Sequence, residues 1–171
     1  MDLKQYVRGI SDFPITGVLF RDITTVLKEP EALKYAIDSM VSLTEGLEFD
    51  LILGPESRGF IFGMPMAYKL GKGFVPVRKA GKLPAEKCKK EYALEYGKAA
   101  IEIHRDAITP GTRVVLADDL LATGGTARAA AELVKEMGGI VAASIFFIEL
   151  SGLMGRKALA GSEVRSLLVY N

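Results

Sequence analysis

The fold of this 171-residue chain is decided by a stretch in its second half, which reads Val114-Val115-Leu116-Ala117-Asp118-Asp119-Leu120-Leu121-Ala122-Thr123-Gly124-Gly125-Thr126. The first four residues are apolar, include two β-branched valines and are too few for a helix, so they predict a buried strand. The alanine-rich residues 126–137 predict a helix that ends at Gly138. A strand that leads through a glycine loop into a helix is the building unit of α/β proteins.

The same alternation of strands and helices extends along most of the chain. Short apolar runs predict strands over residues 51–53, 74–78, 143–150 and 164–170. Helical spacing predicts helices over residues 3–10, 30–46, 59–70, 126–137 and 153–159. Residues 79–91 are rich in lysine and lack periodicity, which predicts a mobile loop, and residues 92–103 predict a β-hairpin that turns at Gly97-Lys98. We therefore expect an α/β fold with a parallel sheet covered on both faces.

The composition indicates one globular domain and excludes several classes of protein. Apolar residues make up 49% and charged residues 25% of the chain. The net charge of +1 provides no general attraction for nucleic acid or for an anionic membrane. Cys88 has no second cysteine to pair with, which favours a reducing compartment, and we expect the cytoplasm. An N-terminus without an apolar core and the absence of an 18-residue apolar run argue against a signal peptide and a membrane span.

The loop after residues 114–117 has the properties of a phosphate site. Its glycines let backbone N–H groups converge on an anion, and the start of the helix adds partial positive charge, so Ala122–Thr126 suits one phosphate. Asp118 and Asp119 are acceptors that suit either a pair of hydroxyls, as in a ribose, or a phosphate-bound Mg²⁺. Together they describe a ribose 5-phosphate site. The simpler alternative is a pair of exposed loop acids before an ordinary helix cap.

A second strand, loop and helix occurs at Leu53-Gly54-Pro55-Glu56-Ser57-Arg58-Gly59-Phe60. Gly54 and Gly59 have Walker A spacing, but Phe60 and Ile61 replace the lysine and hydroxyl residue, so a nucleotide hydrolase is excluded. Ser57, Arg58 and the first helix amides still suit an anion, although a lone loop arginine is often only a surface residue. Because ligands bind at the carboxyl ends of parallel strands, two such loops would fit one ligand with two phosphate groups.

Other chemistry has little support in the sequence. His104 is the only histidine, with no nucleophile motif near it, so a histidine-based triad or metal site is not expected. The basic run over residues 78–90 lacks interleaved aromatic residues, and a solvated lid explains it better than a nucleic-acid surface. Tyr92 and Tyr96 are interpreted as packing residues of the hairpin unless they close over a ligand.

The loop at residues 114–126 resembles the phosphoribosyl pyrophosphate signature of the type I phosphoribosyltransferases. Four further segments resemble the adenine-specific members of that family, and the match runs in order from about residue 12 to the C-terminus. These segments are Phe13-Pro14 with Gly17-Val18-Leu19-Phe20-Arg21-Asp22-Ile23, then residues 54–60, then Arg78-Lys79-Ala80-Gly81-Lys82-Leu83-Pro84, and Tyr92-Ala93-Leu94-Glu95-Tyr96-Gly97.

The resemblance implies a reaction in which adenine and phosphoribosyl pyrophosphate give AMP and pyrophosphate, as in purine salvage. It implies Mg²⁺ held mainly through the substrate, with no direct protein metal site, and a homodimer with neither nucleic acid nor membrane as a partner. The fold it implies is a central parallel sheet flanked by helices, with an N-terminal hood over about residues 1–28 and a flexible hairpin lid over about residues 79–96, in a single domain.

The resemblance also assigns roles to individual residues. The 5-phosphate would bind to Ala122, Thr123, Gly124, Gly125 and Thr126, and the ribose hydroxyls to Asp118 and Asp119. The pyrophosphate would face Glu56, Ser57, Arg58, Arg78 and Lys82, with a cis peptide expected at Glu56-Ser57. The adenine would contact Leu19, Phe20, Arg21, Leu120 and Leu150. Glu95 is expected to exchange a proton with the purine, Tyr96 to seal the site, and Arg58 to stabilise the leaving group.

Two alternatives compete with this function. A phosphoribosyltransferase for another base would carry the same sugar and phosphate motif, and only the hood residues argue against it. A non-catalytic nucleotide sensor with the same fold would be expected to add a DNA-binding part, but the net charge of +1 and the complete lid segment argue against that class.

Overall fold

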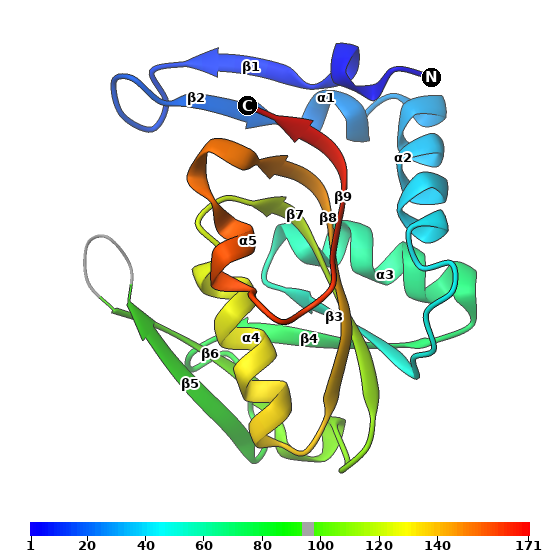
Figure 1. Cartoon of the computed structure of the whole chain (residues 1–171), viewed down its shortest axis with the longest axis vertical. Coiled ribbons are helices and arrows are strands. Elements are labelled where there is room, and N and C mark those ends of the chain that lie inside the picture. The colour runs from blue at the N-terminus through cyan, green and yellow to red at the C-terminus, as the bar shows by residue number, and fades with distance from the viewer. Residues whose placement is uncertain (94–97) are drawn as a thin grey trace. The chain divides into compact units, whose positions relative to one another are not determined.

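The computed structural model describes residues 1–93 and 98–171, and the chain divides into two compact units, Met1–Ser39 and Met40–Asn171. Each unit is built around its own sheet: a two-stranded sheet in the first and a seven-stranded sheet in the second (Figure 1). The division places the predicted hood residues in one unit and both predicted phosphate loops in the other.

The N-terminal unit is a small antiparallel hairpin with short helices. It contains η1 (Leu3–Tyr6), β1 (Arg8–Ser11), β2 (Leu19–Asp22), α1 (Thr24–Leu27) and most of α2 (Pro30–Ser42). The helix predicted over residues 3–10 is wrong beyond Tyr6, because Ile10 pairs with Phe20 across the hairpin. Helical spacing in so short a segment is overridden by strand pairing that becomes visible only when the partner strand is known.

The seven strands of the larger unit lie in the order β5-β6-β4-β3-β7-β8-β9. The strands β3, β4, β7, β8 and β9 are parallel to one another, and the β5-β6 hairpin is antiparallel. This confirms the α/β class and the central parallel sheet. The strands are β3 (Leu51–Pro55), β4 (Gly73–Lys79), β5 (Lys87–Ala93), β6 (Lys98–His104), β7 (Arg113–Leu121), β8 (Ile140–Leu150) and β9 (Val164–Tyr170).

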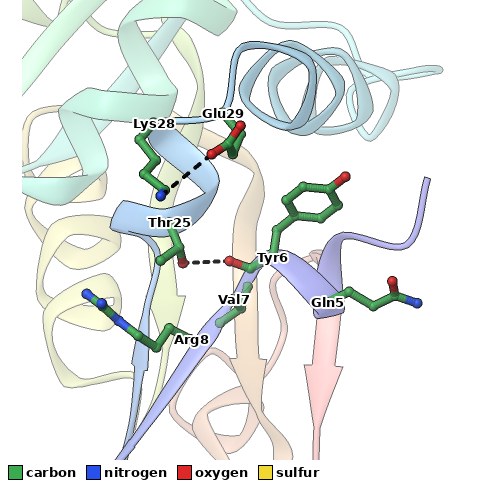
Figure 2. A pocket seen from close by; sticks show the side chains of 7 residues that line it. All are labelled: Gln5, Tyr6, Val7, Arg8, Thr25, Lys28 and Glu29. Atoms are coloured by element: carbon green, nitrogen blue, oxygen red, sulfur yellow. Dashed lines mark hydrogen bonds and ion pairs between the residues drawn. The ribbon is translucent and has the colours of Figure 1, made fainter.

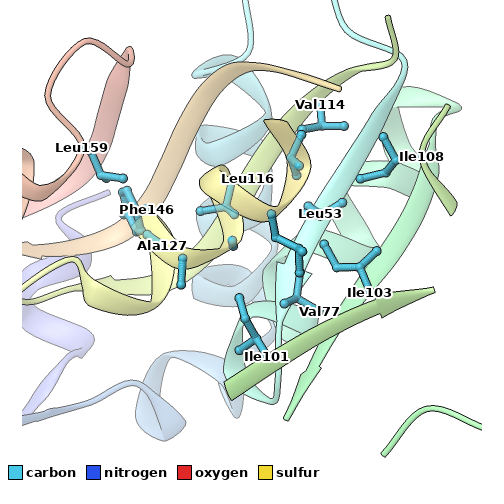
Figure 3. Packing of buried hydrophobic residues seen from close by; sticks show 14 of the residues in the cluster. Leu53, Val77, Ile101, Ile103, Ile108, Val114, Leu116, Ala127, Phe146 and Leu159 are labelled. Atoms are coloured by element: carbon cyan, nitrogen blue, oxygen red, sulfur yellow. The ribbon is translucent and has the colours of Figure 1, made fainter. Parts of the chain in front are cut away.

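Two long helices cover opposite faces of this sheet. On one face, α4 (Gly125–Glu136) places Ala127 and its other buried alanines against Leu53, Leu116 and Phe146 of the sheet, as Figure 3 shows. On the other face, α3 (Arg58–Leu70) stacks Phe62 on Phe147 at 4.7 Å between ring centroids. Both helices agree closely with the bounds predicted from helical spacing.

Short helical segments complete the larger unit. They are η2 (Arg105–Ala107), η3 (Ser151–Leu153) and α5 (Gly155–Ala158). Among the residues that the structure describes, no helix is long and apolar enough to cross a membrane.

The lysine-rich segment is more ordered than predicted. Residues 87–91, expected within a loop, belong to β5, which pairs with β6 along its whole length. Exposed and half-buried residues alternate along this strand, so the lysine at position 90 lies on its inner face, where a long aliphatic stem tolerates partial burial. The prediction of a loop over these residues, which was based on their lysine content, is therefore wrong. The predicted turn falls partly within residues 94–97, which the structure does not describe.

Candidate active site

The two predicted anion loops follow neighbouring parallel strands. β3 pairs with both β4 and β7, and the chain continues from β3 toward one side of the sheet and from β7 toward the other. Such a reversal of strand order opens a crevice at the carboxyl ends of the two strands, where α/β proteins bind ligands. The topology therefore brings residues 56–58 and residues 118–126 to the same edge of the sheet.

The loop after β7 leads into a helix start whose backbone N–H groups have no side-chain cap. Gly124 has φ of 81°, a conformation that favours glycine, and α4 begins at the next residue with no side chain capping its first N–H groups. These open donors, together with the helix dipole, are the physical requirements of a phosphate site.

A second glycine supports this loop from behind. A Cβ at Gly155 of α5 would lie 2.3 Å from the carbonyl oxygen of Ala122, and a Cβ at Gly124 would lie 2.7 Å from the carbonyl oxygen of Gly155. The two backbones therefore approach more closely than any side chain allows. This contact, which sequence reasoning missed, fixes the position of the loop through close packing.

The two carboxylates lie within β7 itself, before the loop. Asp119 is only 7% exposed and accepts a hydrogen bond of 2.5 Å from Nε of Arg58. Asp118 Oδ1 accepts from the backbone N–H of Asp119 at 2.9 Å. Burial of the carboxyl group and the neighbouring charge of Asp119 raise the pKa of Asp118. The interpretation of these residues as exposed loop acids is therefore wrong.

Two of the predicted pyrophosphate residues, Glu56 after β3 and Arg78 of β4, are joined by a hydrogen bond. Glu56 Oε2 accepts from Nε of Arg78 at 2.8 Å and from the backbone N–H of Lys79 at 3.0 Å. The hydrogen bond from Arg78 is the main cause that lowers the pKa of Glu56. The Glu56-Ser57 peptide bond is cis, as expected from the resemblance. Glu56 thus orients Arg78 and the start of the following loop.

The loop that carries Lys82 is anchored by a buried acid. Lys82 itself is exposed, while Oε2 of Glu102, which is 4% exposed, accepts from the N–H of Gly81 at 3.0 Å and lies 3.9 Å from Nζ of Lys87. The predicted catalytic residues Glu95 and Tyr96 lie outside the described residues.

The predicted adenine residues are divided between the two units. Leu19, Phe20 and Arg21 belong to β2 of the N-terminal unit, where Phe20 packs edge-on against Phe13 at 5.2 Å between ring centroids. Leu120 and Leu150 lie near the carboxyl ends of β7 and β8 in the larger unit.

The N-terminal unit also contains an open pocket of about 300 Å³. Figure 2 shows its lining, in which the hydroxyl of Thr25 donates to the carbonyl of Tyr6 and Lys28 approaches Glu29. The pocket shares no residue with the predicted site. Its lining residues are Gln5, Tyr6, Val7, Arg8, Thr25, Lys28 and Glu29.

One contact at the phosphate loop was missed because it depends on tertiary structure. The hydroxyl groups of Tyr92 in β5 and Thr126 in α4 lie 3.1 Å apart. The sequence indicated only that Tyr92 lies on a hairpin, and nothing in the pattern shows that β5 packs along α4.

Comparison with known proteins agrees with this geometry. The model of the phosphoribosyl transferase domain family matches residues 23–157, which include both loops. The chain belongs to this family. The chain is 55% identical over 168 residues to the adenine phosphoribosyltransferase of Lachnoclostridium phytofermentans, which covers 98% of this chain and 97% of that protein.

Solved structures of family members have the same fold. The adenine phosphoribosyltransferase of Thermoanaerobacter pseudethanolicus has a TM-score of 0.96 at 54% identity, covering 99% of this chain and 98% of that one. The Saccharomyces cerevisiae enzyme, in complex with an imino-altritol 1,6-bisphosphate and adenine, has a TM-score of 0.91 at 40% identity, covering 97% and 96% of the two chains. The Trypanosoma brucei enzyme, in complex with AMP, pyrophosphate and ribose-5-phosphate, has a TM-score of 0.88 at 27% identity, covering 98% and 78%.

Proposed function

We propose that the crevice between β3 and β7 carries out the adenine phosphoribosyltransferase reaction. The chain transfers the 5-phosphoribosyl group of phosphoribosyl pyrophosphate to adenine, which gives AMP and pyrophosphate, a purine salvage reaction. The observation that carries this function is the full-length similarity to adenine phosphoribosyltransferases, combined with two anion loops at the ends of neighbouring strands. Two relatives were solved with ligands that carry phosphate groups and adenine or its nucleotide, which supports the same ligands here.

The sugar and its 5-phosphate are assigned to the loop after β7. The backbone N–H groups of residues 122–126 bind the phosphate, and Asp118 and Asp119 accept hydrogen bonds from the ribose hydroxyls. The hydrogen bond from Arg58 to Asp119 supports this arrangement. It fixes the orientation of the carboxylate and uses one of its oxygens, so the second oxygen can accept from a ribose hydroxyl.

The pyrophosphate is assigned to the loop after β3. As the purine nitrogen bonds to the anomeric carbon of the ribose, the bond from that carbon to the pyrophosphate oxygen breaks, and its electron pair leaves with pyrophosphate. The transition state has oxocarbenium character, so negative charge grows on the leaving group. Arg58, Arg78 and Lys82 supply positive charge there, and Glu56 supports the assignment by orienting Arg78.

Mg²⁺ is proposed to bind mainly through substrate oxygens. Among the described residues, no group of three or more His, Cys, Asp or Glu side chains gathers into a metal cage, whereas Asp118 and Asp119 offer the hard oxygen donors that Mg²⁺ prefers beside a phosphate. When bound, the ion neutralises charge that develops on the pyrophosphate.

The residues proposed to contact adenine are Leu120 and Leu150 at the strand ends of the larger unit, and Leu19, Phe20 and Arg21 of β2. Glu95 is proposed to accept the proton that the purine nitrogen loses, and Tyr96 to exclude water from the electrophilic sugar. The proton role predicts that Glu95→Gln lowers the rate of the chemical step about 10²- to 10⁴-fold.

A rapid-quench measurement tests this role of Glu95, because product release can hide the chemical step in steady-state turnover. Glu91→Gln is the matched control, since Glu91 is an exposed acid of the same hairpin that pairs only with Lys89 among the described residues. A chemical step in Glu95→Gln as fast as in Glu91→Gln would exclude the proton transfer.

A homodimer is proposed as the active form. Ile61, Met64 and Tyr68 form an exposed apolar stripe on α3 at helical spacing, with 36%, 55% and 88% exposure. Because α3 begins at Arg58, a second copy that covers this stripe would lie beside the pyrophosphate loop. Light scattering should give the mass of a dimer for the wild type and a monomer for Met64→Glu; a wild-type monomer would contradict the proposal.

The proposed location is the cytoplasm, which suits the unpaired thiol of Cys88.

The base specificity is tested by incubating the protein with phosphoribosyl pyrophosphate, Mg²⁺ and one purine or pyrimidine base at a time. Pyrophosphate release with adenine, and far less with hypoxanthine, guanine or uracil, is the expected result. Preferential release with another base would assign the chain to a different branch of the family. Binding of these ligands without turnover would favour a nucleotide sensor.

A further inference from the structure

The hairpin strand β5 lies along α4 and contacts it at two separate points. Toward the later turns of the helix, Nζ of Lys90 pairs with Glu136 at 2.5 Å and with Glu132 at 3.1 Å. At the first turn, the hydroxyl of Tyr92 lies 3.1 Å from Oγ1 of Thr126. Lys90 and Tyr92 are two residues apart and therefore lie on the same face of the strand. One contact is an ion pair and the other a hydrogen bond between hydroxyls, so each can be removed without the other.

The tyrosine lies directly beside the proposed 5-phosphate site. Its ring carbon Cδ2 is 3.8 Å from where a Cβ of Gly125 would be, and the ring is half-buried against the core. Thr126 follows Gly125 in the first turn of α4, where the open N–H groups of the phosphate loop are found.

The direction of the hydrogen bond between the two hydroxyls follows from the charge of the ligand. Each hydroxyl has one proton to donate, and in the free protein either oxygen can be the donor. A phosphate dianion only accepts hydrogen bonds, so a Thr126 hydroxyl that contacts a phosphate in the loop must donate its proton to it. The threonine oxygen must then accept from Tyr92, and a hydroxyl that both accepts and donates is polarised into a stronger donor.

We propose that Tyr92 is a positioning residue of the 5-phosphate site, whose hydroxyl donates to Thr126 Oγ1 and directs the threonine proton at the phosphate. The inference rests on the proposed phosphate-binding role of residues 122–126. It adds a hairpin residue to a site otherwise built from one loop and one helix start.

The test compares the affinities of AMP and adenosine by calorimetry for the full-length wild type, Tyr92→Phe, Thr126→Val and the double variant. Tyr92→Phe keeps the ring and removes only the hydroxyl. We expect it to weaken AMP binding about 3- to 10-fold, the loss of one hydrogen bond, and to change adenosine binding less than twofold. In the Thr126→Val background the same change should have no further effect, because the threonine hydroxyl through which Tyr92 acts is gone.

Lys90→Met is the matched control for a merely structural role. It removes the ion pairs that attach β5 to α4 while leaving the hydroxyl pair in place. The inference is overturned if Lys90→Met weakens AMP binding as much as Tyr92→Phe does, if Tyr92→Phe binds AMP like the wild type, or if its effect persists in the Thr126→Val background. If the wild type binds AMP no better than adenosine, the phosphate site itself is wrong and the inference falls with it.

Discussion

The loops after β7 and β3, proposed to bind the 5-phosphate and the pyrophosphate, follow neighbouring strands, yet the groups assigned to anion binding are held in different ways. The loop after β7 is fixed by backbone packing: Gly124 and Gly155 bring two main chains together, and the N–H groups of α4 remain open. Around the loop after β3 the cationic side chains are already engaged, Arg58 at the start of α3 by Asp119 and Arg78 of β4 by Glu56.

This difference has a consequence for ligand binding. A preformed backbone site binds phosphate without rearrangement, so little binding energy is spent on ordering it. Side chains that are paired with carboxylates must change or share partners when pyrophosphate arrives, and their affinity for the ligand is reduced by the strength of the pairs that they leave. We therefore expect the 5-phosphate loop to be sensitive to packing and the pyrophosphate loop to be sensitive to charge.

The packing of the 5-phosphate loop is tested by Gly155→Ala, which should have the largest effect. The added Cβ would meet the carbonyl of Ala122 at 2.3 Å, so one backbone must move, at a cost of about 1–3 kcal/mol. AMP affinity should fall about 5- to 150-fold. Gly152→Ala is the control, because a Cβ there meets no atom within 4 Å. Equal AMP affinities in the two variants would show that the loop is not held by this contact.

The charge of the pyrophosphate loop is tested by Arg58→Ala. Loss of a charge-assisted hydrogen bond should raise the Kd of pyrophosphate about 10- to 100-fold, whereas AMP, which depends on Arg58 only through the orientation of Asp119, should lose less. Equilibrium binding of each ligand separates the two effects. Arg105→Ala serves as the control, since Arg105 is an exposed arginine that approaches Glu86. Equal losses for AMP and pyrophosphate would indicate a general defect in folding.

A smaller effect is expected from pH, because the pKa of Asp118 is raised. Below that pKa the carboxyl is protonated and is a poorer acceptor for ribose hydroxyls. AMP affinity should therefore increase as the pH rises through the raised pKa of Asp118, by no more than about tenfold per pH unit. Asp118→Asn should remove this part of the pH dependence and leave the titration of the AMP phosphate. An unchanged profile would show that Asp118 does not bind the sugar.

The sequence predicted the parallel strands, the two long helices and the loops after β3 and β7 because their signals are local. Apolar runs located the parallel strands, and glycines at a helix start located the loop after β7. The interactions that distinguish the two loops are not local: Arg58 and Asp119 are 61 residues apart, and Gly155 approaches Ala122 only after α5 has packed. The burial of Asp119 and the strand β5 were missed for the same reason, since both depend on which segments lie side by side.

The most direct test of the difference between the loops is a titration of pyrophosphate into the wild type and Asp119→Asn at one fixed Mg²⁺ concentration, with AMP titrated in parallel. Because Asp119 accepts a hydrogen bond from Arg58 and is also assigned to the ribose, its neutralisation should weaken AMP binding and should also weaken the charge-assisted hydrogen bond that engages Arg58. Pyrophosphate should bind Asp119→Asn as tightly as the wild type or a few-fold more tightly. A loss of pyrophosphate affinity as large as the loss of AMP affinity would contradict this expectation.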